Sequence, residues 1–202
     1  MKLSNCLNGI ALFFLLCFCI DKASAVSKQK SDKGFTQNFG QWKESFLFRT
    51  NFEQGAAFIE KNGITLHIAD LSWRQGKHLV MPADGRGFRG AALKSIWLNA
   101  SKNINFQKFK PCSYYENYYS GKDPRMWKTN IIPVAQLIAQ SVWPKIDIEI
   151  NTATNSLKTN YVLKPGAKIS DIQIQYPGFH NAFIRKSDGA LVFPLSFLEL
   201  AE

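Results

Sequence analysis

The chain has 202 residues and a formal net charge of +10; 46% of its residues are hydrophobic and 13% are aromatic. This length allows one domain with a single buried core, and the apolar content excludes a disordered chain. A basic charge is compatible with anionic polysaccharide, lipid head groups or nucleic acid. The charge is scattered without a dense lysine or arginine stripe, so simple solubility explains it and we expect no nucleic-acid partner.

The first 25 residues are typical of a secretory signal peptide. Lys2 supplies the positive start, residues 9–20 (GIALFFLLCFCI) form the apolar region, and Ala23-Ser24-Ala25 is an A-x-A cleavage site. The apolar run is short for a membrane-spanning helix, and an uncleaved anchor is the alternative. We therefore expect a secreted or cell-surface protein with no transmembrane segment after cleavage. Residues 26–34 then form a basic, flexible leader.

Cysteine usage fits an exported protein without internal disulfides. Three of the four cysteines lie in the signal peptide, which leaves only Cys112. A lone cysteine with no neighbouring histidine is better explained as a small buried hydrophobe than as a reactive thiol.

The first half of the chain predicts strands separated by turns. Residues 45–52 predict a strand, and residues 56–70 predict a hairpin that turns at Asn62-Gly63. Residues 75–90 are rich in glycine and charge and predict a loop. Further strands are expected at residues 91–100 and 104–112, the second stopping at Pro111.

The second half continues the pattern. Strands are expected at residues 133–142, 145–151, 157–163 and 171–178, with a hairpin that turns at Asp188-Gly189. A helix is the alternative for residues 134–142, because alanine and glutamine favour it. Residues 195–202 have the pattern of a strand with nothing after it.

These elements predict an all-β fold: an antiparallel β-sandwich-like domain with several hairpins and little helix. We expect this single domain to span residues 35–202 and to lack its closing strand, as the front part of a longer protein.

Catalytic and cofactor motifs are missing from the sequence. The three histidines are widely spaced, and no zinc, EF-hand, nucleophile-elbow or phosphate-loop pattern occurs. We therefore expect no metal and no cofactor, and a protein that is not an enzyme.

Two carboxylates on one strand are the nearest approach to a catalytic pair. Asp147 and Glu149 are two residues apart, so they point to the same face and could serve as acid and base in sugar hydrolysis. The favoured alternative makes them the polar face of an edge strand whose isoleucines face the core. Asp147 would then pair with a backbone N–H or with Lys128 or Arg125.

Residues 117–133 (NYYSGKDPRMWKTNIIP) concentrate aromatic side chains around a turn. The favoured interpretation is a loop that packs on its own domain, since aromatic residues beside turns are usually buried. The alternative is a carbohydrate-binding site in which aromatic faces stack on sugar rings and carboxylates hold hydroxyls. Its candidate ligand-binding residues are Tyr118, Tyr119, Asp123, Trp127 and Asp147.

Several motifs in order resemble one known family. They are F-x-x-N-x-G-Q-W at residues 35–42, E-K-N-G at 60–63, N-Y-x-x-G-x-D-P-x-x-W at 117–127, then Ile146-Asp147 and the P-G-A at 165–167. Together they resemble the N-terminal β-rich domain of unknown function found in large exported Bacteroidota proteins. Those proteins carry SBBP β-propeller repeats, PKD-type domains or gliding-motility-associated sorting domains of type IX secretion.

The resemblance implies export and no known catalytic activity. The expected function is that of a non-catalytic N-terminal module in adhesion or surface assembly, with surface polysaccharide or other domains of the parent chain as partners. A carbohydrate-binding or weakly carbohydrate-active domain and a truncated remnant are the alternatives. The matching positions for which we expect structural roles are Gly40, Gln41, Trp42, Asn62, Gly63, Asn117, Gly121, Pro124, Pro165 and Gly166.

Overall fold

The computed structural model describes residues 33–52, 54–70, 74–75, 78–79, 90–153, 156–195 and 199–201. The predicted signal peptide, most of the predicted leader and most of the loop predicted at 75–90 lie outside the described residues.

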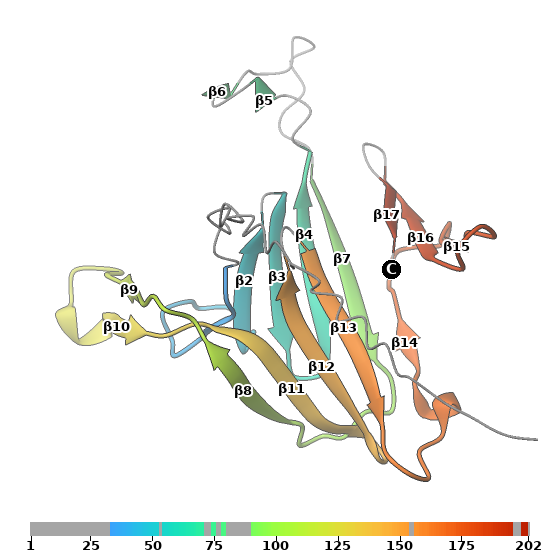
Figure 1. Cartoon of the computed structure of the whole chain (residues 1–202). Coiled ribbons are helices and arrows are strands. Elements are labelled where there is room, and N and C mark those ends of the chain that lie inside the picture. Colours follow the sequence, from blue (N-terminus) through green and yellow to red (C-terminus); the bar gives the residue numbers. More distant parts are fainter. Residues whose placement is uncertain are drawn as a thin grey trace, which may run out of the picture.

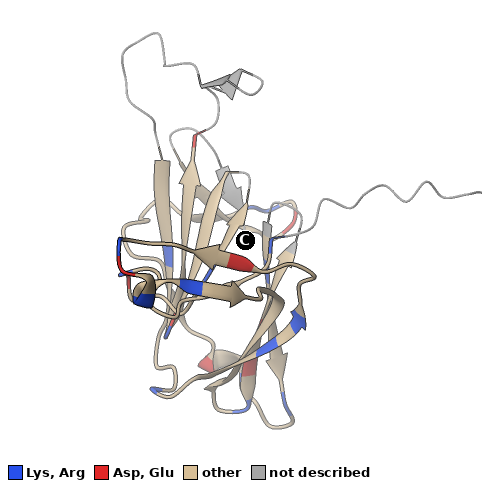
Figure 2. Cartoon of the chain, turned by 90° about the vertical axis from the view of Figure 1, so that its left-hand side faces the viewer, with Lys and Arg blue, Asp and Glu red and all other residues tan. Residues whose placement is uncertain are grey.

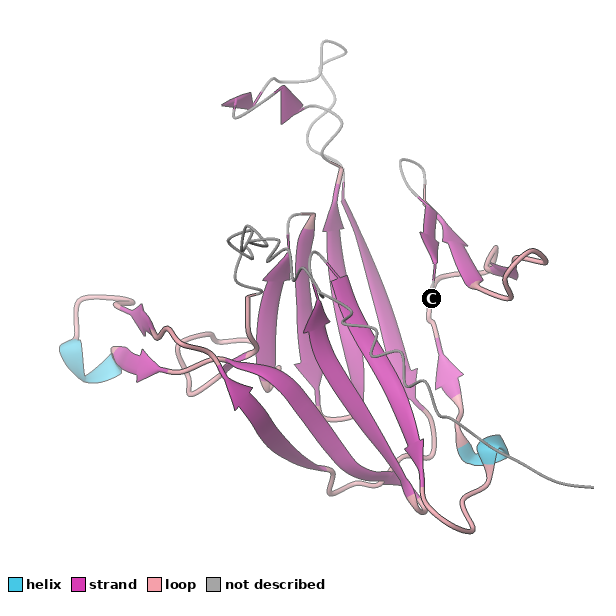
Figure 3. Ribbon diagram, in the orientation of Figure 1, coloured by secondary structure: helices cyan, strands magenta, loops and turns pink. Residues whose placement is uncertain are grey.

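Two antiparallel sheets pack face to face, which confirms the predicted all-β sandwich (Figures 1 and 3). The six-stranded sheet has the order β1-β2-β3-β4-β7-β14, with strands Thr36–Gln37, Phe48–Phe52, Gly55–Glu60, Gly63–Ala69, Gly90–Trp97 and Ile174–Gln175. The four-stranded sheet has the order β13-β12-β11-β8, with strands Ser156–Leu163, Ile146–Ala153, Val134–Trp143 and Asn105–Pro111.

The core lies between the inner faces of the two sheets. Ile146, Ile148 and Ile150 of β12 are fully buried, as the alternating pattern predicts. They share one cluster with Ile59 of β3 and Trp97 of β7 from the other sheet. Each fully buried isoleucine stabilises the fold by roughly 1.5–3 kcal/mol relative to an exposed one, so this strip of apolar contact holds the two sheets together.

Strand β11 settles one open alternative and contains an irregularity. Residues 134–143 form a strand and not a helix, because alternate side chains such as Leu137 and Ala139 fill the core. The register with β12 shifts between Ala139 and Trp143, and Ser141 there has φ 49°. This β-bulge lets the consecutive Val142 and Trp143 both be buried.

An arm projects from the sandwich on the left of Figure 1. We use "the arm" for residues 116–131, which comprise β9 (Glu116–Tyr118), a single 3₁₀ turn η1 (Pro124–Met126) and β10 (Lys128–Ile131). β9 and β10 pair antiparallel, with an irregular register between Lys128 and Ile131.

The C-terminal part adds the 3₁₀ turn η2 (Ile169–Asp171) and a small sheet of β15 (Phe183–Ile184), β16 (Leu191–Pro194) and β17 (Glu199–Ala201). The hairpin predicted at Asp188-Gly189 is confirmed. Gly189 has φ 76° and its N–H donates to the Arg185 carbonyl at 2.8 Å. The strand predicted at 171–178 was too long, since β14 contains only Ile174 and Gln175.

Two turn predictions need correction. The β3–β4 hairpin pairs Glu60 with Gly63, so its loop is Lys61-Asn62 and Gly63 begins β4. Gly63 is required for another reason: a Cβ atom there would lie 2.1 Å from the Ser95 carbonyl oxygen of β7. Within the predicted loop 75–90, Gln75 of β5 (Arg74–Gln75) pairs with His78 of β6 (His78–Leu79).

Candidate functional site

Asn38 organises the loop that carries Trp42. Its side-chain N–H₂ donates to the carbonyl oxygens of Glu44 at 2.9 Å, Phe46 at 3.2 Å and Trp42 at 3.4 Å. Its Oδ1 accepts from the backbone N–H of Gly40 at 2.9 Å and of Trp42 at 3.4 Å. Gly40 has φ 96°, a conformation that favours glycine. The motif at 35–42 is therefore a loop-forming motif.

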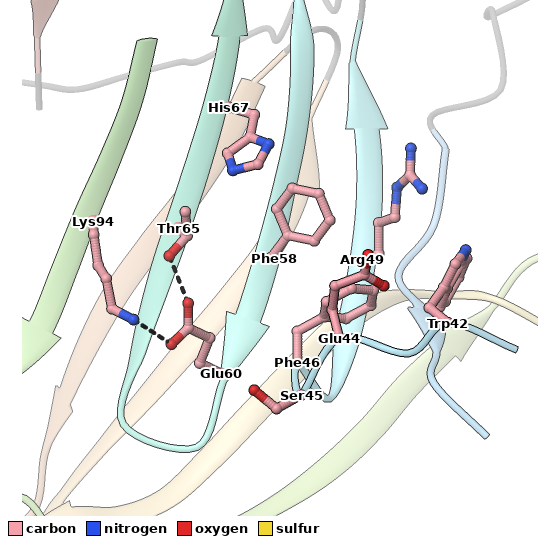
Figure 4. A pocket seen from close by; sticks show the side chains of 10 residues that line it. All are labelled: Trp42, Glu44, Ser45, Phe46, Arg49, Phe58, Glu60, Thr65, His67 and Lys94. Carbon is pink, nitrogen blue, oxygen red and sulfur yellow. Dashed lines mark hydrogen bonds and ion pairs between the residues drawn. The ribbon is translucent and has the colours of Figure 1, made fainter. Parts of the chain in front are cut away.

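This loop places Trp42 against the outer face of the six-stranded sheet. The resulting hollow, which we call the sheet-face groove, has a volume of about 320 Å³ (Figure 4). Ring centroids lie 5.3 Å apart for Trp42 and Phe46, 4.9 Å for Phe46 and Phe58, and 4.7 Å for Phe58 and His67. The outer face of this sheet thus carries a continuous chain of rings, whereas a solvated antiparallel face is usually polar.

The charged groups of the sheet-face groove are bound to one another. Glu60 accepts from Lys94 at 2.7 Å and from the Thr65 hydroxyl at 2.6 Å (Figure 4). Burial raises the pKa of the Glu60 carboxyl, but these two hydrogen bonds and the lysine charge outweigh it and the pKa is lowered. The Arg49 guanidinium carbon lies 5.7 Å from the Trp42 ring centroid and 5.6 Å from that of Phe58, within cation–π range.

Tyr118 joins the arm to this chain of rings. Its ring lies 4.9 Å from Trp42, edge to face, and its hydroxyl donates to Glu116 at 2.6 Å. The same Glu116 oxygen accepts from the Thr36 hydroxyl at 2.7 Å. Burial, followed by the bond to Glu116, raises the pKa of Tyr118 far above its usual range. Tyr118 anchors the arm to the N-terminal strand, so the packing interpretation fits this residue, but Tyr119 and Trp127 farther out on the arm are exposed and depart from it.

The outer part of the arm holds the other aromatic residues. Tyr119 is 62% and Trp127 38% exposed, and their rings meet edge to face at 5.1 Å. The Trp127 indole N–H donates to the Gly121 carbonyl at 3.3 Å. Asp123 caps η1, because it accepts from the Arg125 N–H at 3.0 Å. It also pairs with the Arg125 side chain at 2.7 Å, and the guanidinium lowers the pKa of its carboxyl.

Asp147 lies apart from these residues. Its Oδ1 accepts the Ser141 N–H of the bulge at 2.7 Å, and its Oδ2 pairs with Lys164 at 2.8 Å. A backbone N–H and a basic side chain were the expected kinds of partner, but the lysine is Lys164 instead of Lys128, and Arg125 is bound to Asp123. Ten-residue β11, about 30 Å long, separates this end of the sandwich from the arm.

Asp147 and Glu149 share the outer face of β12, as predicted, but β12 is an inner strand of its sheet and not an edge. Glu149 accepts hydrogen bonds from Asn151 and from Gln136. The bond from Asn151 is the largest influence on its pKa, which is lowered. Burial raises the pKa of Asp147, yet Lys164 and the Ser141 N–H lower it overall. Both carboxyls are therefore ionised at neutral pH.

A second hollow, which we call the arm groove, lies where β10 meets β1 and β8. It has a volume of about 610 Å³ and its walls come from three separate segments. Three exposed apolar side chains line it: Phe39 at 51%, Trp127 at 38% and Ile132 at 57%. The only charged residues that line the groove, among those described, are Lys108 and Lys128. Figure 2, viewed from the arm side, shows basic residues on the arm and on the sandwich strands below it.

The positions with expected structural roles are distributed over turns and contacts. The Gln41 side chain bridges the Phe39 N–H and the Gln37 carbonyl, each at 2.6 Å. Asn117 accepts the Asn130 N–H at 2.8 Å, and Pro124 begins η1. Gly121 and Gly166 have φ 75° and 81°. Gly166 follows Pro165 in a turn that begins at Lys164, whose backbone N–H donates to the Lys145 carbonyl.

Sequence reasoning missed the residues that complete both grooves. Arg49, Phe58 and Lys94 lie on outward-facing positions of β2, β3 and β7 in one cross-strand row. The available signal was their alternation with buried residues, as for Phe58 between Ala57 and Ile59. Phe39 and Lys108 belong to segments about 70 residues apart, and no local pattern brings them together.

Other candidate chemistry is sparse in the part of the chain that the structure describes. It contains no group of three or more histidine, cysteine or acidic residues that could hold a metal ion. Burial raises the pKa of the half-buried Cys112 thiol, which makes it less reactive. None of the described helices has the length and apolar character needed to span a membrane.

Comparison with known proteins gives a family and no function. Residues 35–202 match the family described as "Domain of unknown function (DUF7948)". No curated protein and no solved structure matches the chain. The match starts at Phe35, the first residue of the loop-forming motif, and covers both sheets, the arm and the C-terminal hairpin. The chain therefore belongs to the DUF7948 family, a domain of unknown function.

Proposed function

We propose that this chain is a non-catalytic module of a secreted or cell-surface protein and acts in adhesion or surface assembly. The observation that carries the proposal is the hydrogen bonding of four carboxylates, which include the two on β12 considered as a catalytic pair. Glu60, Asp123, Asp147 and Glu149 are all held in hydrogen bonds that lower their pKa values. A general acid for sugar hydrolysis needs a raised pKa so that it carries a proton at neutral pH.

The surface supports a binding role for the module. The arm groove presents apolar side chains and lysines that other described residues leave accessible. Grooves of this size with aromatic walls and a few polar groups are typical of binding sites. The signal-peptide pattern in residues 1–25 and the resemblance to N-terminal domains of exported Bacteroidota proteins support export and a place among the domains of a larger surface protein.

Two measurements test this proposal on the chain expressed from Met1 in a bacterial host. Fractionation and N-terminal sequencing should find the protein outside the cytoplasm and beginning at Val26. Incubation with a panel of polysaccharides should release no reducing ends. Retention in the cytoplasm with Met1 intact contradicts export. Turnover that disappears in Asp147→Asn contradicts the non-catalytic role.

Carbohydrate binding through residues 114–127 is a second candidate function. The exposed rings of Tyr119 and Trp127 on the arm favour it, and so does their position beside Asp123. Asp147 is too distant to belong to such a site. Glycan-array binding that is unchanged in the Tyr119→Ala, Trp127→Ala double variant would exclude the arm as the platform.

A further inference from the structure

We propose that the arm groove binds an acidic saccharide, whose sugar ring packs on Trp127 and Phe39 and whose carboxylates are held by Lys108 and Lys128. This inference rests on the proposed role as a non-catalytic binding module and gives that module a ligand class and a site.

The apolar part of the site comes from side chains that the fold leaves in solvent. Phe39 lies in the loop that Asn38 organises, Trp127 follows η1 of the arm, and Ile132 follows β10. Each is more than one-third exposed, although all three line one hollow. Exposed apolar groups that converge from separate segments are typical of a binding surface. An aromatic face suits the apolar C–H face of a pyranose ring.

The charge of the groove selects an anion. Lys108 donates to Gln37 at 2.9 Å, a neutral partner, so it keeps its charge available to a ligand. Neither lysine forms an ion pair with a carboxylate among the described residues, in contrast to Lys94, which Glu60 neutralises. Two cations with no carboxylate among the described lining residues create a local positive potential, and the basic net charge of the chain adds long-range attraction for a polyanion.

Polar groups in the same hollow suit the hydroxyls of a sugar. Gln37, Thr129 and Asn130 line the same hollow and offer amide and hydroxyl groups. Asn130 has φ 57°, and Asn117 fixes this residue through its N–H at 2.8 Å. The irregular register at this point of β10 sets the orientation of the groove wall. Rings, hydroxyl partners and cations together match a saccharide with carboxylates better than a peptide made of acidic residues alone, which has no ring to stack.

The test uses three probes with the chain expressed from Met1 and processed by its host. They are a galacturonic-acid oligomer, the galactose oligomer of equal length, and poly-glutamate. Binding is measured by isothermal titration calorimetry at low and high salt. The galacturonic-acid oligomer should bind best, and its affinity should fall with added salt because exposed charges are screened. The other two probes should bind at least about tenfold more weakly, since the galactose oligomer has no carboxylates for the lysines and poly-glutamate has no sugar ring for the aromatic side chains.

Matched variants locate the site. Trp127→Ala should weaken binding of the galacturonic-acid oligomer by about tenfold, the size expected for an aromatic anchor. Lys128→Ala and Lys108→Ala should weaken it by about threefold each, as exposed charge pairs do. Phe109→Ala on β8 and Lys158→Ala on β13 are the controls, since both are exposed outside the groove, and should leave binding unchanged. Thermal unfolding of each variant verifies that it is folded.

Each contrary outcome overturns the inference. Equal binding of the neutral oligomer removes the acidic class, and equal binding of poly-glutamate removes the saccharide. Losses in Phe109→Ala or Lys158→Ala that match those in the groove place the interaction elsewhere. If none of the three probes binds, the acidic-saccharide ligand is rejected. The proposed role as a non-catalytic exported module still stands in that case, provided that the protein is exported and releases no reducing ends from polysaccharides. If the protein binds the galacturonic-acid oligomer but stays in the cytoplasm, the result supports the ligand class and contradicts the exported module.

Discussion

The sheet-face groove and the arm groove use the same kinds of residue in opposite ways. In the first, every ring contacts another ring, and Glu60 neutralises Lys94. In the second, Trp127 touches Tyr119, but Phe39 and Ile132 are more than half exposed. No carboxylate among the described lining residues faces its two lysines. In the sheet-face groove the rings and charges interact with one another, whereas in the arm groove they remain accessible to a ligand.

This difference indicates that aromatic content alone does not identify a binding surface. Rings and charges that satisfy one another stabilise the fold and anchor the arm through Tyr118. Exposed rings, and charges that are not paired with an opposite charge, contribute little to folding and are free to contribute to binding. Substitutions in the sheet-face groove should therefore reduce stability, whereas equivalent substitutions in the arm groove should mainly reduce affinity.

The largest expected effect is that of Trp42→Ala. The substitution removes contacts with Phe46, Tyr118 and Arg49, and we expect a loss of about 3 kcal/mol in the free energy of unfolding. Trp127→Ala in the arm groove should cost about 1 kcal/mol or less, because this residue is more than one-third exposed and lies outside the core. Guanidinium unfolding measures both. Equal losses would contradict the distinction between the two grooves.

Asn38→Ala should have the next largest effect. It removes the side chain that bonds to Trp42, Glu44 and Phe46, so the loop loses its internal support. We expect a loss of about 1–2 kcal/mol, typical of backbone groups left without partners. Asn105→Ala is the control, because among the described residues this exposed side chain bonds only to Gln140, and its loss should cost less than about 0.5 kcal/mol. Urea unfolding monitored by tryptophan fluorescence follows both variants.

Glu60→Gln should have a smaller effect that depends on pH. The pKa of Glu60 is lowered in the folded protein, so its ion pair contributes stability above the unfolded pKa near 4.3 and loses it as the pH falls through the lower folded value. At pH 7 the variant should lose about 0.5–1 kcal/mol, in the range of a half-exposed ion pair. The difference from the unmodified chain should vanish in acid. A constant difference at all pH values would show that packing, and not charge, is responsible.

The smallest effect on stability is expected for Lys128→Ala. Its charge faces no lining carboxylate, so the free energy of unfolding should change by less than about 0.5 kcal/mol. Lys94→Met in the sheet-face groove is the comparison, because it leaves Glu60 without its cation and should cost more. Differential scanning calorimetry at pH 7 compares the two. A larger loss for Lys128→Ala would mean that the arm groove also holds the fold together.

Local pattern predicted the fold better than it predicted the surfaces. The period-2 alternation around Ile146, Ile148 and Ile150 identified a core strand, because a half-buried sheet imposes that pattern on every strand. It missed that β12 is an inner strand, since pairing on both sides depends on distant segments. Gly63 was identified as a special position for the wrong reason, because the constraint is the approach of Ser95 from another strand.

The candidate ligand set shows the same limit. Tyr118, Tyr119, Asp123 and Trp127 lie on one arm, as their closeness in sequence requires. The fold then gives them separate roles: Tyr118 anchors the arm, Asp123 caps η1, and Trp127 lines the arm groove. Asp147 was included as a carboxylate in an apolar strand and as part of the Ile146-Asp147 motif, and the structure places it at the bulge of β11, where it satisfies a backbone N–H.

The sequence by itself determined that this protein is a β-sandwich-like domain, because alternation and turn residues are local consequences of backbone geometry. It also determined the loop around Asn38 and Gly40, whose hydrogen bonds all lie within nine residues. Only the tertiary structure decided which rings and charges satisfy one another and which remain open. That outcome depends on contacts such as Thr36 with Glu116 and Lys108 with Gln37, between residues 80 and 71 positions apart.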